Sequence, residues 1–172
     1  HALAKAAYGK LFDWLVQRIN QALATGVSIR STSFIGILDI FGFEIFKNNS
    51  FEQLCINFTN EKLQQLFNEH TFKEEQAIYI SEGIQFDKIE YVDNQPILDL
   101  IEKRSIQGIM VILDDCNKMS ANTDEKFVTK ADAAHGRSPY YHTSAKTRRG
   151  ATGFTILHYA GEVVYDGTGF LE

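Results

Sequence analysis

The sequence has few cysteines, no long hydrophobic run and no excess of basic residues. Its two cysteines, Cys55 and Cys116, lack metal-ligand spacing and cannot form a disulfide framework, so we expect reduced thiols in a cytoplasmic protein. No apolar run approaches membrane-spanning length and no signal peptide opens the chain, so we expect no membrane span. The net charge of -5 argues against a general nucleic-acid-binding protein, because phosphate backbones require a basic surface.

The composition is that of a folded protein. Hydrophobic residues make up 44% and charged residues 23% of 172 residues, which suits one domain or part of a larger one. The first residue is His1, and the last, Glu172, lies within an apparent structural element. We therefore expect a fragment of a longer protein.

Hydrophobic periodicity predicts a helix and then a strand in the first 47 residues. Apolar side chains recur at helical spacing from Ala2 to Ala24, and Thr25-Gly26 ends that pattern. The continuous apolar run Phe34–Leu38 is short and does not alternate, which is typical of a strand buried on both faces of a parallel sheet.

A long helix is predicted to follow. Ser50 is a candidate N-cap, Gln53 completes a capping box, and Gly83 can stop the helix after about Ile80. The apolar stripe changes register between Phe58 and Leu63, so we expect the helix to bend there or to bury different faces along its length.

The remainder is predicted to be mainly helical, with one hairpin. A helix begins near Pro96, and Asn122 with Glu125 opens another that closes near Gly136. Residues 136–153 have no periodicity and predict a surface loop, and residues 154–165 predict a hairpin.

The run Asp39-Ile40-Phe41-Gly42-Phe43-Glu44 directly follows the predicted strand. Ligands of parallel sheets sit beyond the carboxyl ends of strands, where Asp39 would hold a water on Mg²⁺. Gly42 has no side chain, so its N–H can approach a γ-phosphate, and Glu44 can pair with a basic residue across the site. A D-x-x-G pattern alone is weak evidence, because a strand ending in a glycine-containing turn gives the same letters.

A longer stretch of the sequence is more informative than the D-x-x-G pattern alone. Residues 38–46 and 49–65 resemble the switch II strand and the relay helix of the myosin motor head. Residues 11–16, 99–102 and 158–161 resemble other landmarks of that family, so the resemblance covers essentially the whole chain. It implies an α/β fold, mainly α here: part of a P-loop NTPase-type head with one central-sheet strand. The implied boundaries are a preceding helix at 1–26, strand and switch II at 33–47, relay helix at 50–80, relay loop at 81–93, and a helical lower actin-binding subdomain at 94–172.

The resemblance also implies a function and its residues. It implies an actin-activated ATPase motor in which Gly42 and Glu44 are catalytic, Asp39 and Gly42 bind nucleotide, and Asp39 holds Mg²⁺ through water. It places the actin contact at Ile112, Lys118 and Met119. ATP would bind largely outside this chain, because no P-loop is present, so we expect no catalysis by the fragment alone. The implied partners are the actin filament, the remainder of the head, and light chains or calmodulin.

Two alternatives remain open at this stage. The chain could belong to a myosin-like actin-binding scaffold whose ATPase has lapsed, although the intact Asp39, Gly42 and Glu44 favour a motor. A small GTPase-like switch protein is disfavoured, because such domains have no comparable long helix behind the switch.

Overall fold

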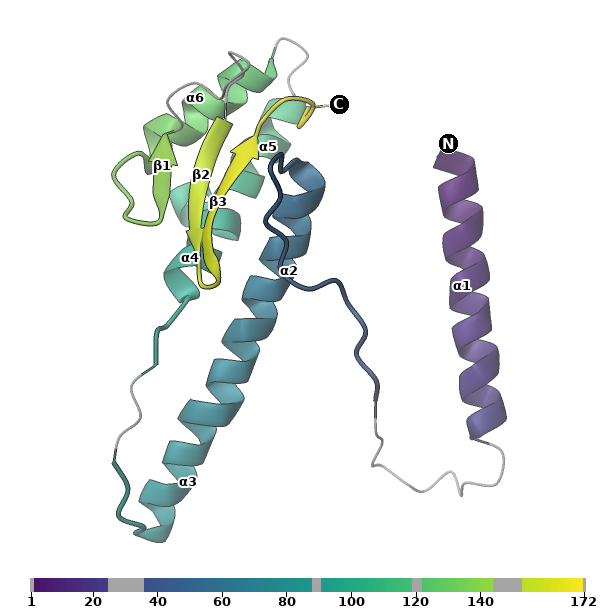
Figure 1. Ribbon diagram of the computed structural model, residues 1–172, viewed down its shortest axis with the longest axis vertical. Coiled ribbons are helices and arrows are strands. Elements are labelled where there is room, and N and C mark those ends of the chain that lie inside the picture. Colours follow the sequence, from purple (N-terminus) through teal and green to yellow (C-terminus); the bar gives the residue numbers. More distant parts are fainter. Residues whose placement is uncertain (1, 25–35, 88–90, 119–121, 144–152, 172) are drawn as a thin grey trace. The chain divides into compact units, whose positions relative to one another are not determined.

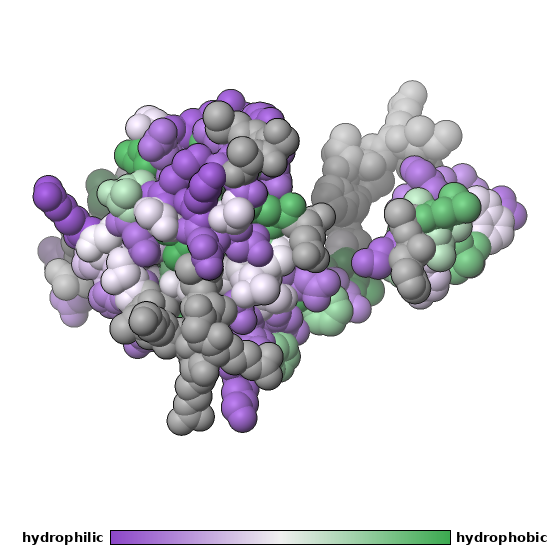
Figure 2. Space-filling view, turned by 90° about the horizontal axis from the view of Figure 1, so that it is seen from above, coloured by the Kyte–Doolittle hydropathy of each residue, from purple (hydrophilic) through white to green (hydrophobic). Residues whose placement is uncertain are grey.

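A computed structural model describes residues 2–24, 36–87, 91–118, 122–143 and 153–171 (Figure 1). The chain divides into two compact units, residues 1–39 and 40–172. Helix α1, Ala2–Leu23, belongs to the first unit and confirms the predicted first helix. Hydrophobic and hydrophilic residues both lie at its surface (Figure 2). None of the described helices combines the length and the hydrophobicity needed to cross a bilayer.

The strand predicted over Phe34–Leu38 is not present in the described part of that run. Residues 36–46 have no regular secondary structure, and Ile37 and Leu38 are largely exposed. A strand exists only where a neighbour pairs its backbone groups, and no described residue pairs with this segment in a ladder. The expected central-sheet strand is therefore not formed by the described residues, whose sheet lies elsewhere in the chain.

A three-stranded antiparallel sheet forms in the C-terminal third, in the order β1-β2-β3. The strands are β1 Tyr141–Thr143, β2 Gly153–His158 and β3 Gly161–Asp166. The β2–β3 pair confirms the predicted hairpin, with His158 opposite Gly161 beside the turn. Strand β1 corrects the prediction of an unstructured loop over 136–153, because Tyr141 pairs with Ile156 and is buried.

Three helices pack with this sheet into the hydrophobic core of the second unit: α4 Gln95–Glu102, α5 Ile109–Asn117 and α6 Asp124–His135. Phe127 of α6 packs edge to face on Phe154 of β2. Thr123, rather than Asn122, caps α6 by accepting from the Lys126 N–H. Gly108 lies so close to the end of α4 that an added Cβ would stand 2.8 Å from the Lys103 nitrogen, so only glycine fits before α5.

The long helical stretch has three parts: α2 Phe51–Asn68, a π-helical segment Glu69–Glu74 and α3 Glu75–Glu82. The capping box is confirmed, since the Ser50 N–H donates to Gln53 Oε1 at 2.9 Å and Ser50 Oγ accepts from the Glu52 N–H. Gly83 ends α3 with φ 68°, as predicted. The register change at Phe58–Leu63 was expected to mark a bend or a change of buried face, but α2 continues through it as regular helix, and the irregular segment starts only after Asn68.

The buried face of α2 is not the apolar stripe. The buried side chains at helical spacing are mostly polar: Leu54, Asn57, Glu61, Gln65 and Asn68. The apolar Leu66 and Phe67 are about half exposed. Within the second unit, α2 therefore meets the hairpin and α4 through polar side chains. Overall the described structure is mostly helical with a small sheet, which agrees with the coarse α/β class.

Candidate functional site

The segment that follows Asp39, residues 40–46 and here called the glycine segment, lies on the first three turns of α2. Asn57 of α2 binds both polar groups of the Glu44 backbone: the Glu44 N–H donates to Asn57 Oδ1, and Asn57 Nδ2 donates to the Glu44 oxygen, each at 2.8 Å. One turn later, Asn60 Nδ2 donates to the Phe41 oxygen at 2.9 Å. The backbone on either side of Gly42 is therefore attached to one helix at two points.

The glycine segment also contacts the β2–β3 hairpin. The Phe43 ring packs edge to face on His158, with centroids 5.2 Å apart, and on Tyr159, at 5.7 Å. A Cβ added to Gly161 would lie 3.8 Å from Ile45 Cδ1, so the hairpin turn comes close to the segment as well. These contacts hold the segment between a helix and a hairpin from distant parts of the chain.

Gly42 is open on its outer side. It is exposed, and a Cβ built on it would meet no heavy atom within 4 Å. Its backbone is outside the left-handed range that would require glycine for conformational reasons. Among the residues that the structure describes, none packs against this position, and the backbone there does not require glycine.

The two carboxylates stand in different units. Asp39 belongs to the first unit, and Gly42 and Glu44 belong to the second. The Glu44 carboxylate accepts from Gln53 Nε2 at 3.4 Å, and neither Asp39 nor Glu44 forms an ion pair with another described residue. No group of three or more potential ligand side chains occurs among the described residues. A single carboxylate could hold Mg²⁺ only through water, with phosphate and water completing the shell of the ion.

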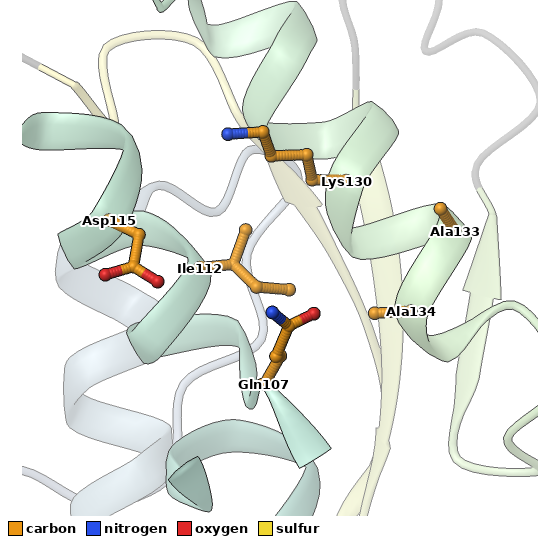
Figure 3. Close-up of a pocket in the computed structure, with 6 residues that line it drawn as sticks. All are labelled: Gln107, Ile112, Asp115, Lys130, Ala133 and Ala134. Carbon is orange, nitrogen blue, oxygen red and sulfur yellow. The ribbon is translucent and has the colours of Figure 1, made fainter. Parts of the chain in front are cut away.

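A groove runs between α5 and α6, with a volume of about 430 Å³. Figure 3 shows Ile112 of α5 between Asp115 on the same helix and Ala134 of α6, with Lys130 above it. The groove thus has an apolar floor and one charged side chain of each sign at its rim.

Comparison with known proteins decides the family. The myosin head (motor domain) family model matches residues 1–172. The chain is 52% identical to the high molecular weight form of myosin-1 of Acanthamoeba castellanii, over 100% of this chain and 11% of that protein. It is 52% identical to the myosin-I heavy chain of Dictyostelium discoideum, over 99% of this chain and 7% of the relative, and 48% identical to myosin-2 of Saccharomyces cerevisiae, over 99% and 11%.

The chain belongs to the myosin head family. It spans about a tenth of the length of these myosins or less.

One of the three residues expected to contact actin is buried in the structure. Ile112 is only 6% exposed and packs in the core between α5 and α6, which is wrong for a side chain expected to protrude from the surface. It is buried because α5 packs its Ile109, Ile112, Leu113 face against α4 and α6. Lys118 is exposed at the end of α5, 2.6 Å from Asp114 Oδ2, and this hydrogen bond raises the pKa of Lys118. Met119 lies outside the described residues.

Sequence reasoning missed the residues that hold the glycine segment. Asn57 and Asn60 were taken only as part of a matching motif, because hydrophobic periodicity gives no weight to polar positions. The available signal was the recurrence of amide and carboxyl side chains at spacings of three and four, which places Asn57, Glu61, Gln65 and Asn68 on one helix face.

Proposed function

We propose that this chain is part of an actin-based, ATP-driven motor and that it couples γ-phosphate sensing at the glycine segment to movement of the relay helix. The observation that carries the proposal is the double hydrogen bond between Asn57 and the Glu44 backbone, together with the bond from Asn60 to the Phe41 oxygen. A displacement of the segment by a phosphate would be transmitted to α2 through these bonds. Membership of the myosin head family supports this reading.

The free energy of a hydrogen bond to a phosphate is large enough for the proposed coupling. A hydrogen bond to a charged group contributes roughly 1.5–3 kcal/mol, which is enough to shift an equilibrium between two loop positions by more than tenfold. A helix is stiff and rises about 1.5 Å per residue, so it carries a tilt at its first turn to its far end. The proposed coupling therefore needs only contacts of the kind found between the glycine segment and α2.

The nucleotide site is shared with the remainder of the head. In this proposal the Gly42 N–H donates to the γ-phosphate, Glu44 closes the loop, and Asp39 holds a water of the Mg²⁺, whose charge would offset that of the phosphates. The P-loop would come from outside this chain. We accordingly expect the 172-residue chain alone neither to bind ATP tightly nor to hydrolyse it.

The actin contact is proposed for the end of α5 and the segment after it. Lys118 offers an exposed cation and Met119 an adaptable apolar side chain. Ile112 would act from beneath, as the floor on which α5 and α6 pack. A motor of this kind works in the cytoplasm on the actin cytoskeleton, with light chains or calmodulin bound through other regions.

Gly42→Ala in a complete myosin head containing this segment tests the proposal. Because the added Cβ meets nothing within 4 Å in this chain, the fold should tolerate alanine. The methyl group should hold the N–H away from the γ-phosphate, and loss of one such donor costs on the order of 10²–10³ in rate. We expect single-turnover hydrolysis to slow by that factor while ATP binding weakens much less.

Gly9→Ala is the matched control, since a Cβ there also meets no atom within 4 Å. It should leave hydrolysis unchanged. Unchanged hydrolysis in Gly42→Ala would refute the role assigned to Gly42. A complete parent head that does not hydrolyse ATP would instead favour the actin-binding scaffold.

A further inference from the structure

Beneath the glycine segment, a chain of buried polar side chains joins α2 to the hairpin and to α4. From Asn57, Nδ2 also donates to Tyr165 Oη at 3.0 Å, and Tyr165 Oη lies 2.8 Å from His158 Nε2. On the other side of the ring, His158 Nδ1 lies 2.9 Å from Glu61 Oε2, and both side chains are fully buried. The second oxygen of Glu61 accepts from Asn94 Nδ2 at 2.7 Å.

The hydrogen atoms can be counted along this chain. With Glu61 as a carboxylate and His158 assigned as the neutral Nδ1–H tautomer, Nδ1 donates to Glu61 and Nε2 accepts from the Tyr165 hydroxyl. Burial raises the pKa of Tyr165, which keeps its hydroxyl protonated and able to donate. The Tyr165 oxygen then accepts from Asn57, whose other amide hydrogen binds the Glu44 oxygen. With this tautomer every link has one donor, and the chain runs unbroken from Glu44 to Glu61.

This arrangement is costly unless it is complete. A buried carboxylate loses several kcal/mol of hydration, which only a sufficient set of hydrogen-bond donors offsets. Buried polar networks fix one arrangement of the elements that carry them, because a small displacement leaves donors unpaired. The elements fixed here are the first half of α2, the hairpin and the N-terminus of α4, to which the Asn94 cap belongs.

Both ends of the network lead to regions with a proposed role. At one end, Asn57 holds the Glu44 backbone, and Phe43 packs on His158 itself. At the other end, the hairpin packs on α6 through Phe154 and Phe127, and α4 packs on α5. Figure 1 shows the hairpin beside the first half of α2, with α5 and α6 around the same sheet.

We propose that Tyr165, His158 and Glu61 are positioning residues that couple the glycine segment to the α5–α6 pair. The inference rests on the proposed function, which assigns nucleotide sensing to the segment and actin contact to the end of α5. Through these three side chains the hairpin would follow the segment when the segment moves. Nucleotide binding and actin binding would then affect each other through the hairpin, in addition to α2, the helix that leads away from the nucleotide site.

Tyr165→Phe in a complete head cuts the network at one atom. It removes the hydroxyl between Asn57 and His158 but keeps the ring, which packs on Phe154 with centroids 5.6 Å apart. Tyr141→Phe is the matched control, because Tyr141 is equally buried in the same sheet and its hydroxyl binds Asp132 at 2.7 Å, away from the glycine segment. The two variants lose the same group from the same kind of environment.

The measurement is the coupling between actin and nucleotide: the factor by which ATP weakens actin affinity, and the maximal actin-activated rate relative to the basal rate. Allosteric coupling is typically 5- to 150-fold, and we expect Tyr165→Phe to reduce both factors about fivefold or more. Tyr141→Phe should change neither, although both variants should lower the melting temperature by similar amounts. Glu61→Gln, which keeps the size of the side chain but puts an amide against a donor, should reproduce the loss if Tyr165→Phe folds poorly.

Full coupling in Tyr165→Phe, or an equal loss in Tyr165→Phe and Tyr141→Phe, would overturn the inference, since the network would then be only structural. These results are separable from failure of the proposed function. If Gly42→Ala slows hydrolysis while Tyr165→Phe keeps full coupling, the sensor role stands and only the hairpin route is lost.

Discussion

The two halves of the long helix have very different surroundings. Residues 51–68 bury five side chains, whereas residues 69–82 bury none. Each half contains a glutamate that pairs with a histidine at nearly the same nitrogen–oxygen distance. Glu61 lies 2.9 Å from His158 of β2, and Glu74 lies 2.8 Å from His70 of the same helical stretch. The first pair is completely buried, and the side chains of the second are 60% and 63% exposed.

The comparison teaches that distance alone does not determine what a polar pair contributes. An exposed pair competes with water and is screened by salt, so it contributes little. A buried pair cannot be broken without leaving a charge or a donor unsatisfied, so its removal is costly even if its formation is not favourable. The π-helical segment Glu69–Glu74 begins where the buried residues stop. A half with buried side chains thus passes into a half that buries none within this unit.

Replacement of the buried glutamate should have the largest effect. Glu61→Ala leaves the donors of His158 and Asn94 without an acceptor, and two unsatisfied buried donors at about 1–3 kcal/mol each cost about 2–6 kcal/mol together. We expect the free energy of unfolding of the chain to fall by that amount in urea titrations. Amide exchange should accelerate throughout residues 51–68. A loss below about 1 kcal/mol would mean that the buried pair behaves like an exposed one and would end the contrast between the halves.

Removal of the helix cap should lower the free energy of unfolding by less than the loss of Glu61. A serine-to-alanine substitution should again have different effects in the two halves. Ser50→Ala deletes the capping box at the start of α2, which costs typically about 1 kcal/mol. Ser81→Ala makes the same substitution in α3, where the exposed hydroxyl only donates back to the Ile78 oxygen, and it should stay within about 0.5 kcal/mol of the parent. The comparison of the two urea midpoints checks the difference. Equal losses would show that α3 contributes as much to unit stability as α2.

Local chemistry explains which parts of this helix the sequence could predict. The cap at Ser50 and the stop at Gly83 depend on residues a few positions apart, and both are confirmed. The hairpin was predictable for the same reason, because its alternation and its turn lie within a dozen residues. The myosin family assignment rested on a contiguous match through this region and is also confirmed.

Features that depend on distant partners were not predictable. The apolar run Phe34–Leu38 reads as a strand, but strand formation needs neighbours that the described residues do not supply. The polar side chains on the buried face of α2 have hydrogen-bond partners at His158, Tyr165 and Asn94. These partners lie 33 to 108 positions away in the sequence. The family resemblance placed Ile112 at the actin contact, yet packing with residues distant in sequence leaves it only 6% exposed. The candidate site roles of Asp39, Gly42, Glu44, Lys118 and Met119 remain predictions.

The smallest effect is expected at the exposed pair, and it is the most direct test of the contrast. Glu74→Ala removes the carboxylate beside His70 on the π-helical segment, where both side chains face water. Exposed pairs one turn apart contribute about 0.3–0.5 kcal/mol, and salt at 1 M shortens the screening length to about 3 Å. We expect unfolding free energies of the parent and Glu74→Ala to differ by less than 0.5 kcal/mol in dilute buffer and to coincide at 1 M salt. The loss in Glu61→Ala should survive the same salt, because ions do not reach a fully buried pair. A salt-resistant loss in Glu74→Ala would show that the second half of the helix is held as firmly as the first, and that the change of surroundings at Asn68 has no energetic counterpart.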